Sequence, residues 1–194
     1  MENLELVLPE IFLSISIMFL LILGVFKKNS SKLIQTISLI VLLITTMITF
    51  NETLSIEKTL LFNNSIIVDY LSSFMKIITL ISAFFVLLIS SSYLSIFKIL
   101  KIEYPILILS SVLGMMIMIS SNDLIVFYMG LELQSLALYV LATFNRDQLK
   151  SSEAGLKYFV LSALSSGLLL YGCSLIYGFT GSTNFNLIAS QLNS

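Results

Sequence analysis

The sequence predicts an all-α membrane protein, a polytopic bundle of six transmembrane helices. The chain is 57% hydrophobic and 11% charged over 194 residues, and its mean hydropathy is +1.02, whereas soluble domains carry about 25% charged residues. Nearly uncharged runs of about 18 to 25 residues follow one another, which is the length that a helix needs to cross the hydrocarbon core. The basic residues gather in alternate connections between these runs, as in multi-pass chains.

Local signals mark where several of the spans begin. Pro9 and Pro105 stand at the starts of the first and fourth spans, where proline is tolerated because the first helical turn needs no N–H donor. A residue within 121–123 can cap the fifth span, and Ser151 and Ser152 form an N-cap pattern for the sixth. The predicted spans cover residues 9–26, 33–50, 71–93, 105–120, 123–144 and 154–179.

The distribution of positive charge predicts the orientation of the bundle. The first, third and fifth loops hold most of the basic residues, namely Lys27, Lys28, Lys32, Lys98, Lys101, Arg146 and Lys150. By the positive-inside rule these loops face the cytoplasm or the matrix, and both termini then lie outside, in the periplasm or the intermembrane space. The first ten residues contain no Lys or Arg, so we expect no cleaved signal peptide.

The predicted outer side contains the only long loop, residues 51–70, in which Asn63-Asn64 suggests the turn of a hairpin or of an interfacial segment. Lys76, a turn or so into the third span, is expected to snorkel to the outer interface. Glu10, near the outer end of the first span, is expected to be interfacial as well. The polar tail after the sixth span has the apolar spacing of a short interfacial helix.

Glu132 is the most informative residue, because it places a carboxyl group about 13 Å into the fifth span, near the bilayer centre. An ionised carboxylate there costs at least a few kcal/mol, so it is either protonated or paired with a cation or water in an interior cavity. Tyr128, Ser135 and Tyr139 lie on the same face at helical spacing. The pattern favours a functional protonatable group, and the alternative is a protonated side chain that only joins two helices by a hydrogen bond.

The start of the sixth span carries Glu153 and Lys157, which are four residues apart in the favourable order for an ion pair. By spacing alone this is a surface pair of little energetic weight. Further along, the small-residue pairs Ser162/Ser166 and Ala163/Gly167 predict close packing on a neighbouring helix.

The composition excludes several other functions. The chain has no His and one Cys, so it cannot hold a His-ligated haem or copper, an iron–sulfur cluster or a thiolate zinc site by itself. Cys173 lies in an apolar run and is interpreted as a packing residue. A formal net charge of −1 offers no basic surface for nucleic acid.

Two stretches, FYMGLELQSLALYVLATFNR (127–146) and SSEAGLKYFVLSALSSGLLLYGCSLIYGFTGS (151–182), resemble the subunit 2 family of respiratory complex I. These are antiporter-like, proton-translocating membrane subunits of NADH:ubiquinone oxidoreductase. The resemblance implies that Glu132 is the fifth-helix glutamate of the proton path and that Glu153 and Lys157 match the charged start of the sixth helix. It also implies that residues 1–104, with the outer loop, form three leading helices, and that residues 105–194 form the first three helices of an inverted repeat.

Members of this family pair the fifth-helix glutamate with a lysine on a broken seventh helix, which lies beyond the end of this sequence. The sequence is therefore either a truncated piece or one part of a split subunit. We expect a split subunit, with a second polypeptide that carries the remaining helices and the lysine facing Glu132. Other expected partners are further membrane-arm subunits and lipid, but no nucleic acid.

The expected function is proton translocation coupled to NADH:ubiquinone oxidoreduction, as part of the H⁺-translocating NADH:ubiquinone reductase. We expect no cofactor in this chain, with NADH, FMN, iron–sulfur clusters and ubiquinone bound elsewhere in the complex. The alternatives are a purely structural or assembly piece of the membrane arm and a subunit of a related cation/proton antiporter complex. The expected location is the mitochondrial inner membrane, and the alternative is the bacterial plasma membrane.

Overall fold

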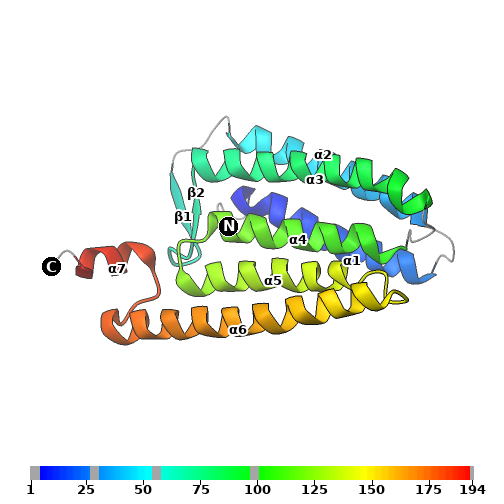
Figure 1. The fold of residues 1–194 in the computed structure, drawn as a ribbon. Helices are drawn as coiled ribbons and strands as arrows, with labels where there is room; N and C mark the ends of the chain where they lie inside the picture. Colours follow the sequence, from blue (N-terminus) through cyan, green and yellow to red (C-terminus); the bar gives the residue numbers. More distant parts are fainter. Residues whose placement is uncertain (1–4, 27–30, 54–57, 97–100, 193–194) are drawn as a thin grey trace.

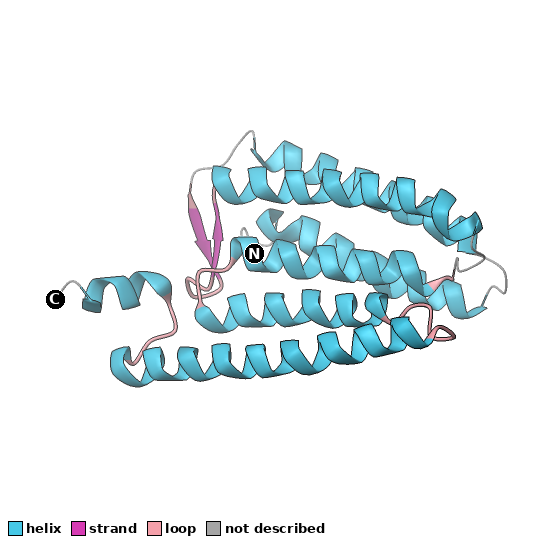
Figure 2. Cartoon of the chain, viewed as in Figure 1, coloured by secondary structure: helices cyan, strands magenta, loops and turns pink. Residues whose placement is uncertain are grey.

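A computed structural model describes residues 5–26, 31–53, 58–96 and 101–192, and it confirms the all-α membrane bundle. Six helices are long and apolar enough to cross a membrane, and they run alongside one another (Figures 1 and 2). The six helices are α1 (Leu8–Phe26), α2 (Ser31–Thr53), α3 (Tyr70–Ile96), α4 (Glu103–Ser120), α5 (Leu124–Ala142) and α6 (Leu149–Thr180). A 3₁₀ turn, η1 (Glu5–Val7), precedes α1.

The packing order explains which helices are covered. The helix α4 packs against α1, α3 and α5, whereas α6 packs against α5 at the edge of the bundle. Figure 1 shows α2 and α3 on one side, α5 and α6 on the other, and α1 and α4 between them. The core is made of apolar side chains from α1 to α4, with Leu13, Leu20, Leu80 and Leu109 fully buried. We call the part formed by α1 to α4, which encloses this core, the closed side of the bundle, and the edge formed by α5 and α6 the open side.

The start of α6 differs from the prediction. The helix begins at Leu149 after an extended Gln148, so the prediction that Ser151 and Ser152 cap it is wrong. Both serines lie inside the first turn, where their hydroxyls donate to the carbonyls of Ala142 at 2.9 Å and Arg146 at 3.2 Å. Because the serines bond back to the preceding connection, they fasten α6 to the end of α5 without capping it.

The predicted hairpin is present in the outer loop. Strands β1 (Thr59–Leu61) and β2 (Ile66–Val68) pair antiparallel, and Phe62, Asn63 and Asn64 all have positive φ in the turn. Asparagine tolerates this left-handed backbone better than most residues. The hairpin lies at the end of the bundle where α3 begins and α4 ends (Figure 2).

A polar network joins the connections at this end. The side-chain amides of Asn122 and Asn184 both donate to the carbonyl of Asn64, each at 2.8 Å. Asp123 accepts a hydrogen bond at 2.5 Å from Thr183 and caps α5 through the N–H of Ile125 at 2.8 Å. The predicted cap of α5 is thus confirmed, and the same residues hold the hairpin and the tail in place.

The tail forms the predicted short helix, α7 (Phe185–Leu192). At the other end of the bundle, the starts of α2, α4 and α6 lie together (Figure 1), and with them Lys32, Lys101 and Lys150. Lys58, just before β1, lies with the hairpin at the opposite end, so most but not all of the basic residues in the described connections gather at one end. Which side of a membrane that end faces stays a prediction.

Candidate functional site

Glu132 lies halfway along α5, as predicted. Its side chain is half-buried, but Oε1 is shielded from solvent and receives no hydrogen bond from the part of the chain that the structure describes. A shielded carboxyl oxygen without a partner is unfavourable by roughly 1–3 kcal/mol. The geometry therefore leaves Glu132 in need of a proton donor or a cation.

The other residues of the predicted stripe make different contacts, and none of those described joins Glu132 through its side chain. Tyr128 is half-buried one turn before Glu132. Ser135 donates at 2.7 Å to the carbonyl of Leu131 within its own helix, so in this arrangement its proton is not directed at Glu132. Tyr139 is buried and donates at 2.5 Å to the Ser162 hydroxyl of α6. The stripe is real as a helix face, but its hydroxyls are not joined to Glu132 in a chain.

A polar hollow lies between α5 and α6 beside this face. It has a volume of about 480 Å³ and is lined by Leu131, Ser162, Ser165, Ser166, Leu168 and Leu169. Three serine hydroxyls next to the Leu131–Glu132 turn provide donors and acceptors for water. The hollow is large enough for several water molecules, since one occupies about 30 Å³ of liquid. Leu131, the sequence neighbour of Glu132, borders this groove, whereas Glu132 itself is not among its lining residues.

Glu153 and Lys157 form the predicted ion pair, with Nζ and Oε1 2.6 Å apart and both side chains more than half exposed. The structure does not bring this pair to Glu132. The Tyr139–Ser162 contact sets the register of the antiparallel helices, and a rise of 1.5 Å per residue puts Lys157 about 18 Å from Glu132 along the axes. Any influence of Lys157 on Glu132 has to pass through other groups.

The outer face of α6 is uncovered. Gly155 is its one buried residue among those described, and a Cβ there would collide with the Thr143 side chain. Gly167, by contrast, has no atom within 4 Å of the position of a Cβ. The packing predicted at Ser162/Ser166 is found in part, because Ser162 accepts the hydrogen bond of Tyr139 and both serines line the hollow beside α5. The packing predicted at Ala163/Gly167 has no partner helix in the described part of the chain, where both residues are exposed.

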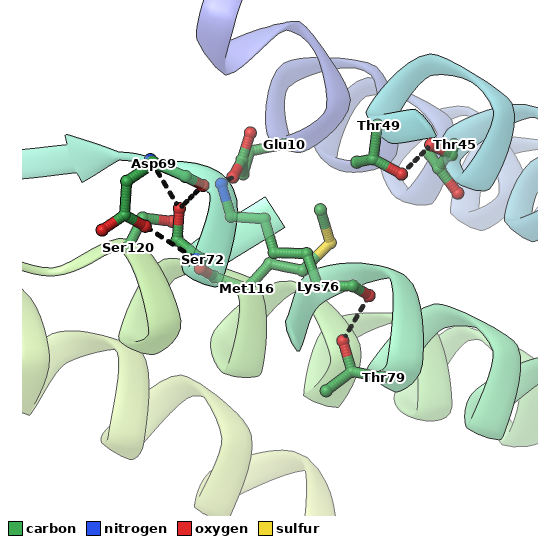
Figure 3. Close-up of polar contacts among 9 residues, drawn as sticks. All are labelled: Glu10, Thr45, Thr49, Asp69, Ser72, Lys76, Thr79, Met116 and Ser120. Atoms are coloured by element: carbon green, nitrogen blue, oxygen red, sulfur yellow. Dashed lines mark hydrogen bonds and ion pairs between the residues drawn. The ribbon is translucent and has the colours of Figure 1, made fainter. Parts of the chain in front are cut away.

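Sequence reasoning missed a second ionic site. Lys76 does not snorkel, because its side chain is 3% exposed and pairs at 2.5 Å with Glu10, which is itself 10% exposed (Figure 3). The depth of Glu10 in a membrane stays a prediction. Lys76 lies on the stripe of α3 that faces the core, with Ser72, Ser73 and Leu80 also buried. The helical spacing of Ser72, Lys76 and Leu80 could have shown this from the sequence, because it puts Lys76 on the inner face of the helix.

A third ionisable group belongs to this second site. Glu52, near the end of α2, is half-buried and interacts electrostatically with both Glu10 and Lys76. It follows Thr45 and Thr49, which are buried on the same helix face and bond to carbonyls within α2. Three of the leading helices thus contribute one ionisable group each.

The comparisons with known proteins agree with the resemblance seen in the sequence. Residues 121–194 match the sequence model of the family described as NADH:quinone oxidoreductase/Mrp antiporter, transmembrane. The whole chain is 69% identical over 194 residues to NADH-quinone oxidoreductase subunit N of Pelagibacter ubique, and covers 41% of that protein. It is 53% identical over 191 residues to subunit N of Bartonella bacilliformis, with 98% of this chain and 39% of the relative covered. The chain thus spans about two fifths of the length of the curated relatives it matches.

Solved structures share the fold. A chain of respiratory complex I from Thermus thermophilus, solved with bound aureothin, superposes with a TM-score of 0.75 at 27% identity, over 91% of this chain and 38% of that one. A chain of an archaeal membrane-bound sulfane sulfur reductase superposes with a TM-score of 0.79 at 23% identity, over 95% of this chain and 39% of that one, which shows the fold alone. Residues 121–194 are thus similar to the NADH:quinone oxidoreductase/Mrp antiporter transmembrane family, and the whole chain is similar to a part of subunit N of NADH-quinone oxidoreductase.

Proposed function

We propose that this chain is part of the proton-translocating membrane arm of an NADH:quinone oxidoreductase, in which Glu132 is a protonatable group of the proton path. The observation that carries the proposal is the shielded Oε1 of Glu132, which no described residue bonds, on the side of the bundle where α6 is uncovered. The similarity to subunit N supports the assignment to this complex. The redox chemistry, with NADH, FMN, iron–sulfur clusters and ubiquinone, would take place in other subunits.

The mechanism follows from the electrostatics of a carboxyl group in a medium of low dielectric constant. A cation that approaches Glu132 favours its ionised form, and a cation that withdraws favours its protonated form. We propose that a lysine on a helix outside this sequence is that cation, and that water in the groove lined by Ser162, Ser165 and Ser166 carries the proton. Tyr128, Ser135 and Tyr139 would line the path, and Glu153 and Lys157 would lie toward its loop end.

The test is Glu132→Gln in the assembled complex, reconstituted into vesicles. Gln keeps the size of the side chain but cannot ionise, so we expect proton pumping to fall strongly while the amount of assembled complex stays unchanged. Proton uptake would be followed with a pH-sensitive dye during NADH oxidation. Glu103→Gln is the matched control, because Glu103 is exposed at the start of α4. Pumping at the wild-type level in Glu132→Gln would contradict the proposal.

In the purely structural alternative, a protonated Glu132 only donates a hydrogen bond to another helix. The same variant separates the two, because Glu132→Gln would then pump protons as the wild type does. The family description also includes Mrp antiporters, yet the relatives that cover the whole chain are NADH-quinone oxidoreductase subunits. These observations favour the respiratory complex over a cation/proton antiporter complex.

We also propose that the remaining helices are supplied by a second polypeptide and that lipid and other membrane-arm subunits cover the exposed helices. An antibody against residues 121–194 tests the first point, because a split subunit gives a band of 21.7 kDa and an undivided one a band more than twice as large. The named relatives are bacterial, which favours the bacterial plasma membrane over the mitochondrial inner membrane as the location.

A further inference from the structure

A basic pocket lies where α5 ends, at the end of the bundle opposite the hairpin (Figure 1). It has a volume of about 370 Å³ and is lined by Lys101, Glu103, Val140, Thr143, Phe144 and Arg146. Lys101 comes from the connection that precedes α4, whereas Arg146 comes from the connection between α5 and α6. Two cations from separate connections therefore border one pocket.

The basic pocket has an excess of positive charge. Neither Lys101 nor Arg146 forms an ion pair with any residue that the structure describes. Glu103 is the one acidic residue of the lining, so the lining carries a formal charge of +1. Asp147 and Lys150 follow along the chain with opposite charges, and together they leave this excess unchanged. The pocket therefore suits a group with one negative charge.

The ammonium group of Lys101 is held in place by an aromatic ring. Its Nζ lies 5.7 Å from the centre of the Phe144 ring, a distance at which the face of a ring attracts a cation. Tyr104 of α4 packs on Phe144 in turn, with the ring centres 5.5 Å apart and the rings edge to face. Lys101 is half-buried as a result, so its side chain is ordered before an anion binds.

An apolar cleft continues from the basic pocket along α5 and α6. Val140 and Thr143 border both spaces, and the cleft, of about 360 Å³, extends to Tyr139, Leu156 and Phe159. The side chains of Val140, Leu156 and Phe159 are each exposed over half or more of their surface. The Thr143 hydroxyl donates to carbonyls of its own helix, so it does not call for a polar partner in the cleft.

The basic pocket and the apolar cleft match the two parts of a phospholipid. The end of a spanning helix meets the headgroup region of the bilayer, and basic pockets between membrane helices bind anionic headgroups there. A free phosphate ion would fill the pocket but gain nothing from the cleft, because apolar surface is covered favourably by apolar groups. The occupant that uses both spaces has a negative head and an acyl chain.

We infer that the basic pocket and the apolar cleft bind one anionic phospholipid, with its phosphate between Lys101 and Arg146 and an acyl chain against Val140 and Phe159. A headgroup with one net negative charge neutralises the lining, whereas a zwitterionic headgroup leaves it at +1. The bound lipid fastens the start of α4 to the end of α5. The inference requires only that the helices span a membrane, so it is independent of Glu132 and of the proposed function.

The test is photo-crosslinking in the native assembly, reconstituted into vesicles with equal parts of phosphatidylglycerol and phosphatidylcholine that carry the same acyl chains. Phe159→benzoylphenylalanine places the crosslinker in the cleft, and mass spectrometry of this chain identifies the attached lipid. One net positive charge favours an anionic lipid by about fivefold, so phosphatidylglycerol should exceed phosphatidylcholine by that factor. Leu161→benzoylphenylalanine is the matched control, because Leu161 is exposed on α6 but does not line the cleft. It should capture both lipids equally.

Charge variants connect the lipid preference to the basic pocket. Arg146→Gln and Lys101→Gln should each lower the lipid ratio at Phe159 to about one, because each leaves the lining without net charge. Arg146→Lys keeps the charge and should keep most of the preference. Lys58→Gln removes one positive charge at the hairpin end, where Lys58 is exposed, and should leave the ratio unchanged.

Several results would overturn the inference. Equal capture of the two lipids at Phe159, or a preference that survives the combined Lys101→Gln and Arg146→Gln substitutions, would mean that the pocket does not select the headgroup. A crosslink from the cleft to another protein chain would mean that a subunit covers it. Loss of the preference on addition of inorganic phosphate would mean that the pocket binds a free anion. Stronger capture of phosphatidylethanolamine than of phosphatidylglycerol would mean that the headgroup is zwitterionic.

Discussion

Glu10 and Glu132 are both glutamates on apolar membrane helices, but the chain treats them differently. Glu10 meets Lys76 at 2.5 Å inside the closed part of the bundle, whereas Oε1 of Glu132 meets no donor among the described residues. The helix that packs beside Glu132 is also open, since none of the spanning window of α6 is buried, although α3, which carries Lys76, is no more buried than α5. The difference teaches that the leading helices pair a buried charge among themselves, and it supports our proposal that α5 and α6 form one half of an interface.

The largest expected effect is the removal of one partner on the closed side. Lys76→Met leaves Glu10 as a buried carboxylate without its cation, so we expect the free energy of unfolding to fall by about 3–5 kcal/mol at neutral pH. Helicity against denaturant, in detergent micelles, measures it.

The double variant Glu10→Gln with Lys76→Met controls for packing. It removes both charges together, and we expect it to recover most of the lost stability. If Lys76→Met alone unfolds no more easily than the wild type, the closed side does not depend on the buried pair, and the contrast with Glu132 is wrong.

The next largest effect is a loss of stability at Gly114 of α4, which packs closely on Gly130 of α5. A Cβ at Gly114 would lie 2.6 Å from the backbone N of Gln134 and 2.8 Å from the carbonyl of Gly130, so Gly114→Ala has to push α4 and α5 apart. Overpacking of this kind costs about 1–3 kcal/mol. Gly167→Ala on α6 is the matched control, because no atom lies near its Cβ, and the higher helix propensity of Ala should stabilise the isolated chain by up to about 1 kcal/mol.

In the assembled complex, Gly167→Ala should have the opposite effect. If helices from outside this sequence pack on the small residues of α6, then Gly167→Ala should weaken the assembly while it stabilises the isolated chain. Native gel electrophoresis of solubilised membranes would show less of the full complex. Equal assembly of the Gly167→Ala variant and the wild type would mean that this face of α6 is covered by lipid alone.

The smallest expected effect belongs to the exposed ion pair. Glu153 and Lys157 are in contact at 2.6 Å but more than half exposed, and such pairs contribute about 0.3–0.5 kcal/mol. Lys157→Ala should therefore change the free energy of unfolding of the isolated chain by about one tenth of the effect of Lys76→Met. A loss of several kcal/mol would show that the pair is structural and would weaken its assignment to the proton path.

The sequence predicted the six spans, the hairpin and the tail helix well, because each rests on local signals: uninterrupted apolar length, Asn63-Asn64 in a turn, and Asp123 as a cap. The prediction for Lys76 was wrong because snorkelling was inferred from distance to the helix end alone. The periodic stripe that turns Lys76 inward was visible, but its partner on α1 is more than sixty residues away in the sequence. Such a pairing depends on which helices become neighbours.

The site at Glu132 shows a different limit. The position of Glu132 halfway along α5 followed from the sequence and was found. The hydroxyl of Ser135, however, donates to the backbone of its own helix, and helical spacing alone does not show such a bond. The cation that we propose for Glu132 belongs to a helix outside this sequence, so reasoning on this chain alone could not identify it.

The central claim is that Glu132 is one half of a charge pair that is completed across the open side of the bundle. The most direct measurement is an experimental structure of the assembled membrane arm that resolves the Glu132 side chain. We predict that a lysine nitrogen from a helix outside this sequence lies within about 4 Å of the carboxylate, directly or through one water. A carboxyl group surrounded only by apolar side chains or by lipid, with no basic residue or water in reach, would contradict the account.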